Sequence, residues 1–107
     1  MTPAVRQEEP VPRPPRLSPD DVAAALRGLP EWSGGPGGIE RTVVLPGFRE
    51  AVAAVVAVAD VAEELDHHPD LDVRYRTLRI AVVTHSAGGV TELDLELARR
   101  VDALLAG

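Results

Sequence analysis

The chain has 107 residues, a formal net charge of −6 and no cysteine. Apolar residues make up 45% of it, yet no apolar run approaches the ~20 residues that a helix needs to cross a bilayer, so a membrane-spanning helix is excluded. The negative charge argues against direct nucleic-acid binding, which requires a basic face to neutralise phosphates. Without cysteine, and without a basic start followed by an apolar segment, we expect a cytoplasmic protein.

The first part of the chain differs in composition from the rest. Residues 1–16 contain five prolines and three arginines but little apolar surface, too little to offset the entropy of ordering. We therefore expect residues 1–16 to form a disordered tail and residues 17–107 to form one domain. Within that domain, Ser18 as cap and Pro19 in the first helical position predict a helix that Gly28 ends.

The later elements follow from periodicity and turn residues. They are, in chain order, a strand beginning at Trp32, a glycine-rich connection over 33–38, a strand over 39–45, a helix over 48–66, strands over 72–76 and 78–85, and a last helix capped by Thr91. In the strand over 78–85, apolar Leu78, Ile80 and Val82 alternate with Arg79, Ala81 and Val83. The order αββαββα predicts an α+β fold, with an antiparallel four-stranded sheet and helices packed on one face.

The helix over 48–66 is the longest expected element. Its apolar stripe consists of Phe48, Val52, Val55, Val56, Ala59, Ala62 and Leu65, and that of the last helix consists of Leu93, Leu97, Val101 and Leu104. Pro69 disfavours helical geometry at His68 and so places His67 and His68 in the last turn. About 90 ordered residues bury only a modest core, so a valine-rich helix and a half-apolar outer sheet face suggest self-association.

The three histidines of the chain indicate a proton-transfer site. Glu63 lies one turn before His67, where its carboxylate can hold an imidazole nitrogen, and His85 lies at the end of a strand. The simpler interpretation is that His67 and His68 only interact with the helix dipole. A zinc site is not expected, because adjacent helical side chains point about 100° apart and no cysteine is present. The glycines at 34–38 lack the sequence context of a phosphate-binding loop.

With its neighbours, this pattern resembles the pterin-4a-carbinolamine dehydratase family. The family has an acidic residue, three spacer residues, His-His-Pro, an aromatic residue, a further His after a strand and a late Asp. The matching residues here are Glu63, His67, His68, Pro69, Tyr75, His85 and Asp94. The resemblance covers roughly residues 17 to 105. Leu71 and Arg76 depart from it, since the family usually has an aromatic residue and an Asn at these positions.

The resemblance implies a function and roles for individual residues. The chain would dehydrate 4a-hydroxytetrahydropterin to quinonoid dihydropterin, with His67 and His85 as the main acid and base, His68 holding the pterin and Glu63 orienting His67. Which histidine performs which step stays open. The expected substrate contacts are Trp32, Asp66, Tyr75, Thr84 and Asp94. No metal or other cofactor is implied, and the family resemblance points to a homodimer or homotetramer.

Two residues and the function itself have alternative interpretations. Asp94 follows Thr91 at the spacing of a capping box, so it could secure the start of the last helix as well as support the site. Trp32 could be a core residue or lie at the rim of the site. The alternative function is a non-catalytic protein-binding module on the same fold, a dimerisation cofactor or assembly factor, which Leu71 and Arg76 keep open.

Overall fold

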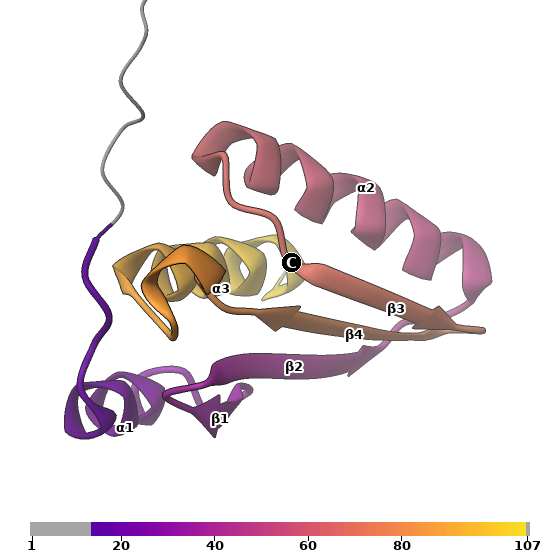
Figure 1. Ribbon diagram of the computed structural model, residues 1–107. Helices are drawn as coiled ribbons and strands as arrows, with labels where there is room; N and C mark the ends of the chain where they lie inside the picture. Colours follow the sequence, from indigo (N-terminus) through magenta and orange to yellow (C-terminus); the bar gives the residue numbers. More distant parts are fainter. Residues whose placement is uncertain (1–13, 107) are drawn as a thin grey trace, which may run out of the picture.

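The computed structural model describes residues 14–106 (Figure 1). Its elements are α1 (Pro19–Arg27), β1 (Ser33–Gly35), β2 (Gly38–Val44), α2 (Phe48–Leu65), β3 (Asp70–Arg74), β4 (Thr77–Val82), the 3-10 helix η2 (His85–Ala87) and α3 (Glu92–Ala106). This order confirms the predicted αββαββα arrangement, with η2 as a short addition before α3. Most of the predicted tail, residues 1–13, lies outside the described residues.

The four strands form one antiparallel sheet in the order β1-β2-β4-β3. Ile39 of β2 and Leu78 and Ile80 of β4 are fully buried, and α2 and α3 lie over that face in Figure 1. Val22 of α1 joins the same buried cluster, so one core holds the helices to the sheet. The predicted alternation along β4 is confirmed, because its even-numbered side chains face the core and its odd-numbered ones face outward.

The first helix follows its predicted chemistry closely. The Ser18 hydroxyl accepts a hydrogen bond from the backbone N–H of Asp21 at 3.1 Å, Pro19 is the first helical residue and Gly28 is the C-cap. Just before it, the N–H of Leu17 donates to the carbonyl of Val90 at 2.9 Å. This bond ties the start of the domain to the segment that leads into α3.

The glycine-rich segment after α1 differs from the prediction. Residues 33–38 were expected to be a connection, but Ser33–Gly35 forms β1, which pairs with β2 across a tight turn. Gly34 and Gly38 have φ of 129° and 153°, which side chains rarely adopt, so glycine permits the hairpin without supplying the alternating side chains from which a strand is predicted.

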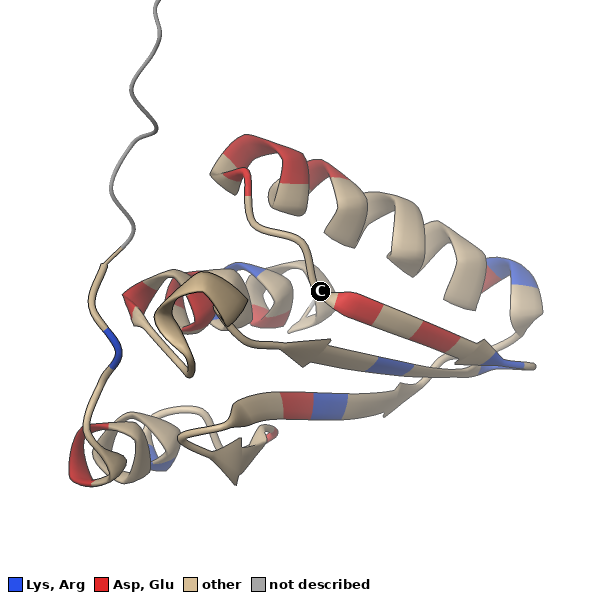
Figure 2. Cartoon of the chain, in the orientation of Figure 1, with Lys and Arg blue, Asp and Glu red and all other residues tan. Residues whose placement is uncertain are grey.

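Helix α2 buries a different face from the one expected. Phe48, Val52 and Val56 are 54%, 42% and 58% exposed. Of the predicted stripe, Ala62 is buried and Val55 and Leu65 pack partly buried against the core, while the other buried side chains of α2 are Ala51, Ala54, Val58 and Val61. Small residues on this face let α2 lie close to α3, since a short side chain allows two helix axes to approach. The middle of α2 carries no charged residue, as Figure 2 shows, and its exposed stripe of Phe48, Val52 and Val56 is apolar.

The last helix is also rotated slightly from its prediction. Leu97 and Val101 are buried as expected, but Leu104 is 43% exposed and Leu95 occupies a core position instead. Thr91 precedes α3, as predicted. Among residues 14–106, no helix is both long and apolar enough to span a membrane.

Candidate functional site

The end of α2 separates the two adjacent histidines. The helix stops at Leu65, three residues earlier than Pro69 predicts, because Asp66 adopts the left-handed conformation with φ of 49°. The N–H groups of Asp66 and His67 donate to the carbonyls of Glu63 and Ala62 at 3.3 and 3.0 Å. This pair of bonds is a Schellman motif with Asp at the position that usually holds Gly. It turns the chain so that His67 is buried and His68 is exposed.

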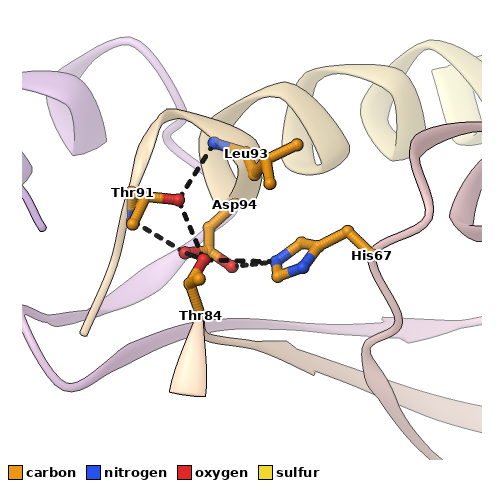
Figure 3. A network of polar contacts seen from close by, with 5 residues as sticks. All are labelled: His67, Thr84, Thr91, Leu93 and Asp94. Carbon is orange, nitrogen blue, oxygen red and sulfur yellow. Dashed lines mark hydrogen bonds and ion pairs between the residues drawn. The ribbon is translucent and has the colours of Figure 1, made fainter. Parts of the chain in front are cut away.

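The buried imidazole of His67 contacts a carboxylate from α3 (Figure 3). Nε2 of His67 lies 2.6 Å from Oδ1 of Asp94, although 27 residues separate them in the sequence. His67 is 7% exposed and Asp94 is fully buried. Because a buried ion pair or hydrogen bond has little competition from water, this contact fixes the orientation of the ring.

Asp94 also makes both contacts that the sequence left as alternatives. Its Oδ2 accepts the backbone N–H of Thr91 at 2.8 Å, and the Thr91 hydroxyl accepts the N–H of Leu93 at 3.2 Å. These bonds cap the start of α3. The same Oδ2 accepts the hydroxyl of Thr84 at 2.8 Å, so one carboxylate links the helix cap, the end of the sheet and His67.

Glu63 is paired with a different histidine from the one expected. Its Oε2 lies 2.6 Å from Nε2 of His68, and both side chains are largely exposed. The expectation that Glu63 orients His67 assumed that the helix continues through both histidines. Since α2 ends at Leu65, His67 turns inward and His68 takes the place beside Glu63.

His85 lies in a short loop whose base is held by the same network. It begins η2 and is exposed, beyond the end of β4 at Val82, not within a strand as predicted. The backbone of Thr84 pairs with that of Gly89 across this loop, with N···O distances of 3.2 and 3.3 Å. A Cβ at Gly89 would lie 2.7 Å from the carbonyl oxygen of Pro36, so the close packing there requires glycine. His67 is thus part of the buried network, while His68 and His85 each follow one of its residues, His67 and Thr84, in the sequence.

Two aromatic residues of the expected site lie elsewhere in the chain. Trp32 is 5% exposed in the core, and its indole N–H donates to Oδ1 of Asp102 at 2.8 Å. Asp102 is eight residues beyond Asp94, about 12 Å along α3. Tyr75 is 70% exposed in the turn between β3 and β4. Thr84 lies beyond the other end of β4, and the length of that strand is about 17 Å. The structure therefore does not bring either ring beside the histidines.

An ion pair that the sequence did not reveal holds Trp32 in place. Nη1 of Arg41 on β2 lies 2.6 Å from the same Oδ1 of Asp102. The two residues are 61 apart in the sequence, and neither belongs to a recognisable motif, so only the packing of α3 on the sheet could identify them. Among the described residues, no group of three or more His, Asp or Glu side chains is arranged to hold a metal ion.

An open groove of about 400 Å³ lies near the histidine-bearing segments. Asp70, two residues after His68, and Val83, two residues before His85, both line it. Glu40 and Arg79 form an ion pair of 2.6 Å in its wall, on the outer sheet face. The Arg79 guanidinium, through its hydrogen bond and its charge, holds the pKa of Glu40 below the ordinary value. The wall of the groove therefore contains glycine backbone, at Gly35, Gly37 and Gly38, and one ion pair.

Comparison with known proteins assigns the chain to a family. The family model of pterin 4 alpha carbinolamine dehydratase matches residues 15–104. A relative from Mycolicibacterium smegmatis that carries this family's name is 48% identical over 89 residues, which cover 83% of this chain and 95% of that protein. A second, from Streptomyces coelicolor, is 54% identical over 92 residues, with coverage of 85% and 91%.

Solved structures share the fold. The crystal structure of a transcriptional coactivator/pterin dehydratase from Brucella melitensis matches with a TM-score of 0.78 and 36% identity, over 83% of this chain and 97% of that one. A pterin dehydratase-like protein identified as a RuBisCO assembly factor in the alpha-carboxysome matches with a TM-score of 0.56 and 23% identity, over 68% and 84%, which shows a likeness of fold alone. From the family model and the curated relatives together, the chain belongs to the pterin 4 alpha carbinolamine dehydratase family.

Proposed function

We propose that the protein dehydrates 4a-hydroxytetrahydropterin to quinonoid dihydropterin by histidine acid–base catalysis, a step in tetrahydrobiopterin recycling. The observation that carries this proposal is the buried contact between Nε2 of His67 and Asp94, with His68 and His85 held next to the same network. An imidazole held in one orientation by a buried carboxylate suits general acid–base catalysis, which depends on a positioned side chain that gains or loses a proton.

The reaction requires two proton transfers and no oxidation or reduction. The hydroxyl group on C4a leaves as water after it receives a proton from an acid, and the proton on N5 passes to a base, so the enzyme gains no net proton. Imidazoles can serve in both roles near neutral pH. We assign these roles to His67 and His85, the binding of the pterin to His68, and the orientation of His68 to Glu63.

We propose the groove on the outer sheet face, lined by Asp70 and Val83 among others, as the place for the pterin ring. Its volume of about 400 Å³ is within the range of small-molecule sites, roughly 300–1,000 Å³. It reaches to within two residues of both His68 and His85 along the chain. Asp66 adjoins His67 in the sequence, and its predicted contact with the substrate stays a prediction.

The test of this function is the rate of appearance of the quinonoid product from freshly generated 4a-hydroxytetrahydropterin. The protein should raise this rate above the uncatalysed one. His85→Ala should remove about 10²–10⁴-fold of the acceleration, and His68→Ala should mainly raise KM. Arg74→Ala is the matched control, because Arg74 is exposed at the opposite end of the sheet. If the unmodified protein gives only the background rate, this proposal is wrong.

A second candidate function, protein binding, is favoured by the exposed stripe of Phe48, Val52 and Val56 on α2. Large apolar side chains grouped on one helix face of a small domain are typical of an interface. The first occupant we propose is a second copy of the chain, giving a homodimer or homotetramer in which two α2 helices pack together. Occupancy by a different protein would make the chain a non-catalytic dimerisation cofactor or assembly factor.

Mass measurement by light scattering tests this surface. Val52→Asp should dissociate the oligomer, because it places a charge in the apolar interface. Ala23→Asp on α1 is the control, since Ala23 is an exposed helical alanine outside the stripe. A monomeric parent protein would exclude self-association through α2. A monomeric, inactive parent that loses binding to a partner protein on Val52→Asp would favour the binding function.

A further inference from the structure

Thr84 lies at the centre of the buried network that reaches His67. Its Oγ1 is 2.8 Å from Oδ2 of Asp94 and 2.8 Å from Oγ1 of Thr91, and 3.5 Å from Nε2 of His67. Thr84 is 2% exposed, so its hydroxyl is not available to a ligand in the groove. The sequence led us to expect that Thr84 contacts the substrate, but its position indicates that it acts through Asp94.

The hydrogen atoms of the network can be assigned from the donors and acceptors present. An ionised carboxylate only accepts hydrogen bonds, so the single hydroxyl proton of Thr84 points to Asp94. The contact between the two threonines must then use the hydroxyl proton of Thr91, with Thr84 as the acceptor. This leaves the Thr91 oxygen free to accept the N–H of Leu93, as the structure shows. Every hydroxyl in the network therefore donates once.

The same assignment determines which nitrogen of His67 carries a proton. Oδ2 of Asp94 accepts two hydrogen bonds, one from the hydroxyl of Thr84 and one from the backbone of Thr91. These two donors fix the plane of the carboxylate and turn Oδ1 toward His67, where it lies 2.6 Å from Nε2. Since Oδ1 can only accept, Nε2 must be protonated. Neutral imidazole has one N–H, so Nδ1 is the nitrogen without a proton.

We propose that Thr84 is a positioning residue that sets the tautomer of His67, and that His67 exchanges its catalytic proton through Nδ1. This inference rests on the proposed dehydratase function and deepens it by naming the reacting atom. Thr84 also closes the loop that carries His85, through its backbone pairing with Gly89. One residue thus couples the orientation of His67 to the placement of His85.

The tautomer can be measured without reference to activity. In protein labelled with ¹⁵N-histidine, the imidazole correlation spectrum distinguishes a protonated Nε2 from a protonated Nδ1. At a pH where His67 is neutral, the parent protein should show the Nε2–H form alone. A predominant Nδ1–H form of His67 in the parent protein would overturn the assignment directly, whatever the behaviour of any variant.

Variants at Thr84 test its positioning role. Thr84→Val is nearly isosteric but removes the hydroxyl, so the neutral ring should show a mixture of tautomers and kcat should fall about 10- to 100-fold with little change in KM. Thr84→Ser restores the hydroxyl and should restore both the Nε2–H form and kcat. If Thr84→Val keeps the Nε2–H form and the parental kcat, Thr84 is not a positioning residue.

The spectrum also separates this inference from the proposed function. A parent protein without dehydratase activity, in which His67 is nevertheless Nε2–H and loses that preference in Thr84→Val, would overturn the reaction but support the positioning role of Thr84. An active parent protein with His67 in the Nδ1–H form would support the reaction and overturn the role that we give to Thr84 and Nδ1.

Discussion

Asp94 should be the most sensitive single position in the protein, because removal of its carboxylate affects stability and activity together. Asp94→Ala leaves three donors without an acceptor: the N–H of Thr91, the hydroxyl of Thr84 and Nε2–H of His67. Asp94→Asn is the informative comparison. Its amide oxygen can still accept from the two threonines, but its NH₂ group faces His67.

The size of the effect follows from these contacts. Loss of a helix cap costs about 0.5–2 kcal/mol, and a buried donor left without a partner costs about 1–3 kcal/mol. For Asp94→Ala we expect a loss of about 3–5 kcal/mol in the free energy of unfolding, similar to breaking a buried ion pair. In a domain of this size that lowers Tm by roughly 15–30 °C. Asp94→Asn keeps the cap and should lose only about 1–2 kcal/mol.

Urea unfolding followed by circular dichroism measures both losses, and the dehydration assay measures turnover in the folded fraction. We expect Asp94→Asn to be much more stable than Asp94→Ala but similarly impaired in kcat, because both variants lose the acceptor for His67. Equal stability of the two variants would show that the capping contacts contribute nothing. A parental kcat in folded Asp94→Asn would show that the contact with His67 has no part in turnover.

Other positions give separate expectations. Gly89→Ala should lose about 1–3 kcal/mol in urea unfolding, because its methyl group would lie 2.7 Å from a backbone carbonyl oxygen, whereas Gly37→Ala, with nothing within 4 Å, is the control and should change little. Tyr75→Asn should raise stability by up to about 1 kcal/mol, because Tyr75 has φ of 55° and Asn tolerates this conformation better; an unchanged Tm would contradict the strain. The pKa of Glu40 is lower in the folded protein than its ordinary value of 4.5, because of Arg79, so the ion pair stabilises the fold above that pH. The difference in unfolding free energy between the parent and Glu40→Gln should therefore shrink as the pH falls below about 4.5 and through the lower pKa that Glu40 has in the folded protein. A difference that stays constant with pH would show that the ion pair does not cause it.

The sequence by itself determined the elements that depend on neighbouring residues. The cap at Ser18, the first helical residue Pro19, the alternation along β4 and the capping residue Thr91 are all local signals, and the structure has each where the sequence predicted it. The family pattern could also be read directly from the spacing of the histidines and acidic residues. Capping hydrogen bonds and side-chain periodicity involve residues that are close in the sequence, so they can be predicted from it.

Tertiary structure decided which side chains His67 and His68 contact. Pro69 predicts a helix that continues to the histidines, but Asp66 ends it early in a left-handed turn, a conformation that Asp adopts occasionally and that no pattern in the sequence signals here. The partner of His67 is Asp94 of α3, 27 residues away in the sequence, and Glu63 contacts His68. Likewise, the indole of Trp32 finds Asp102 only once α3 packs on the sheet. Contacts between distant segments depend on how whole elements pack, and no short pattern in the chain encodes that.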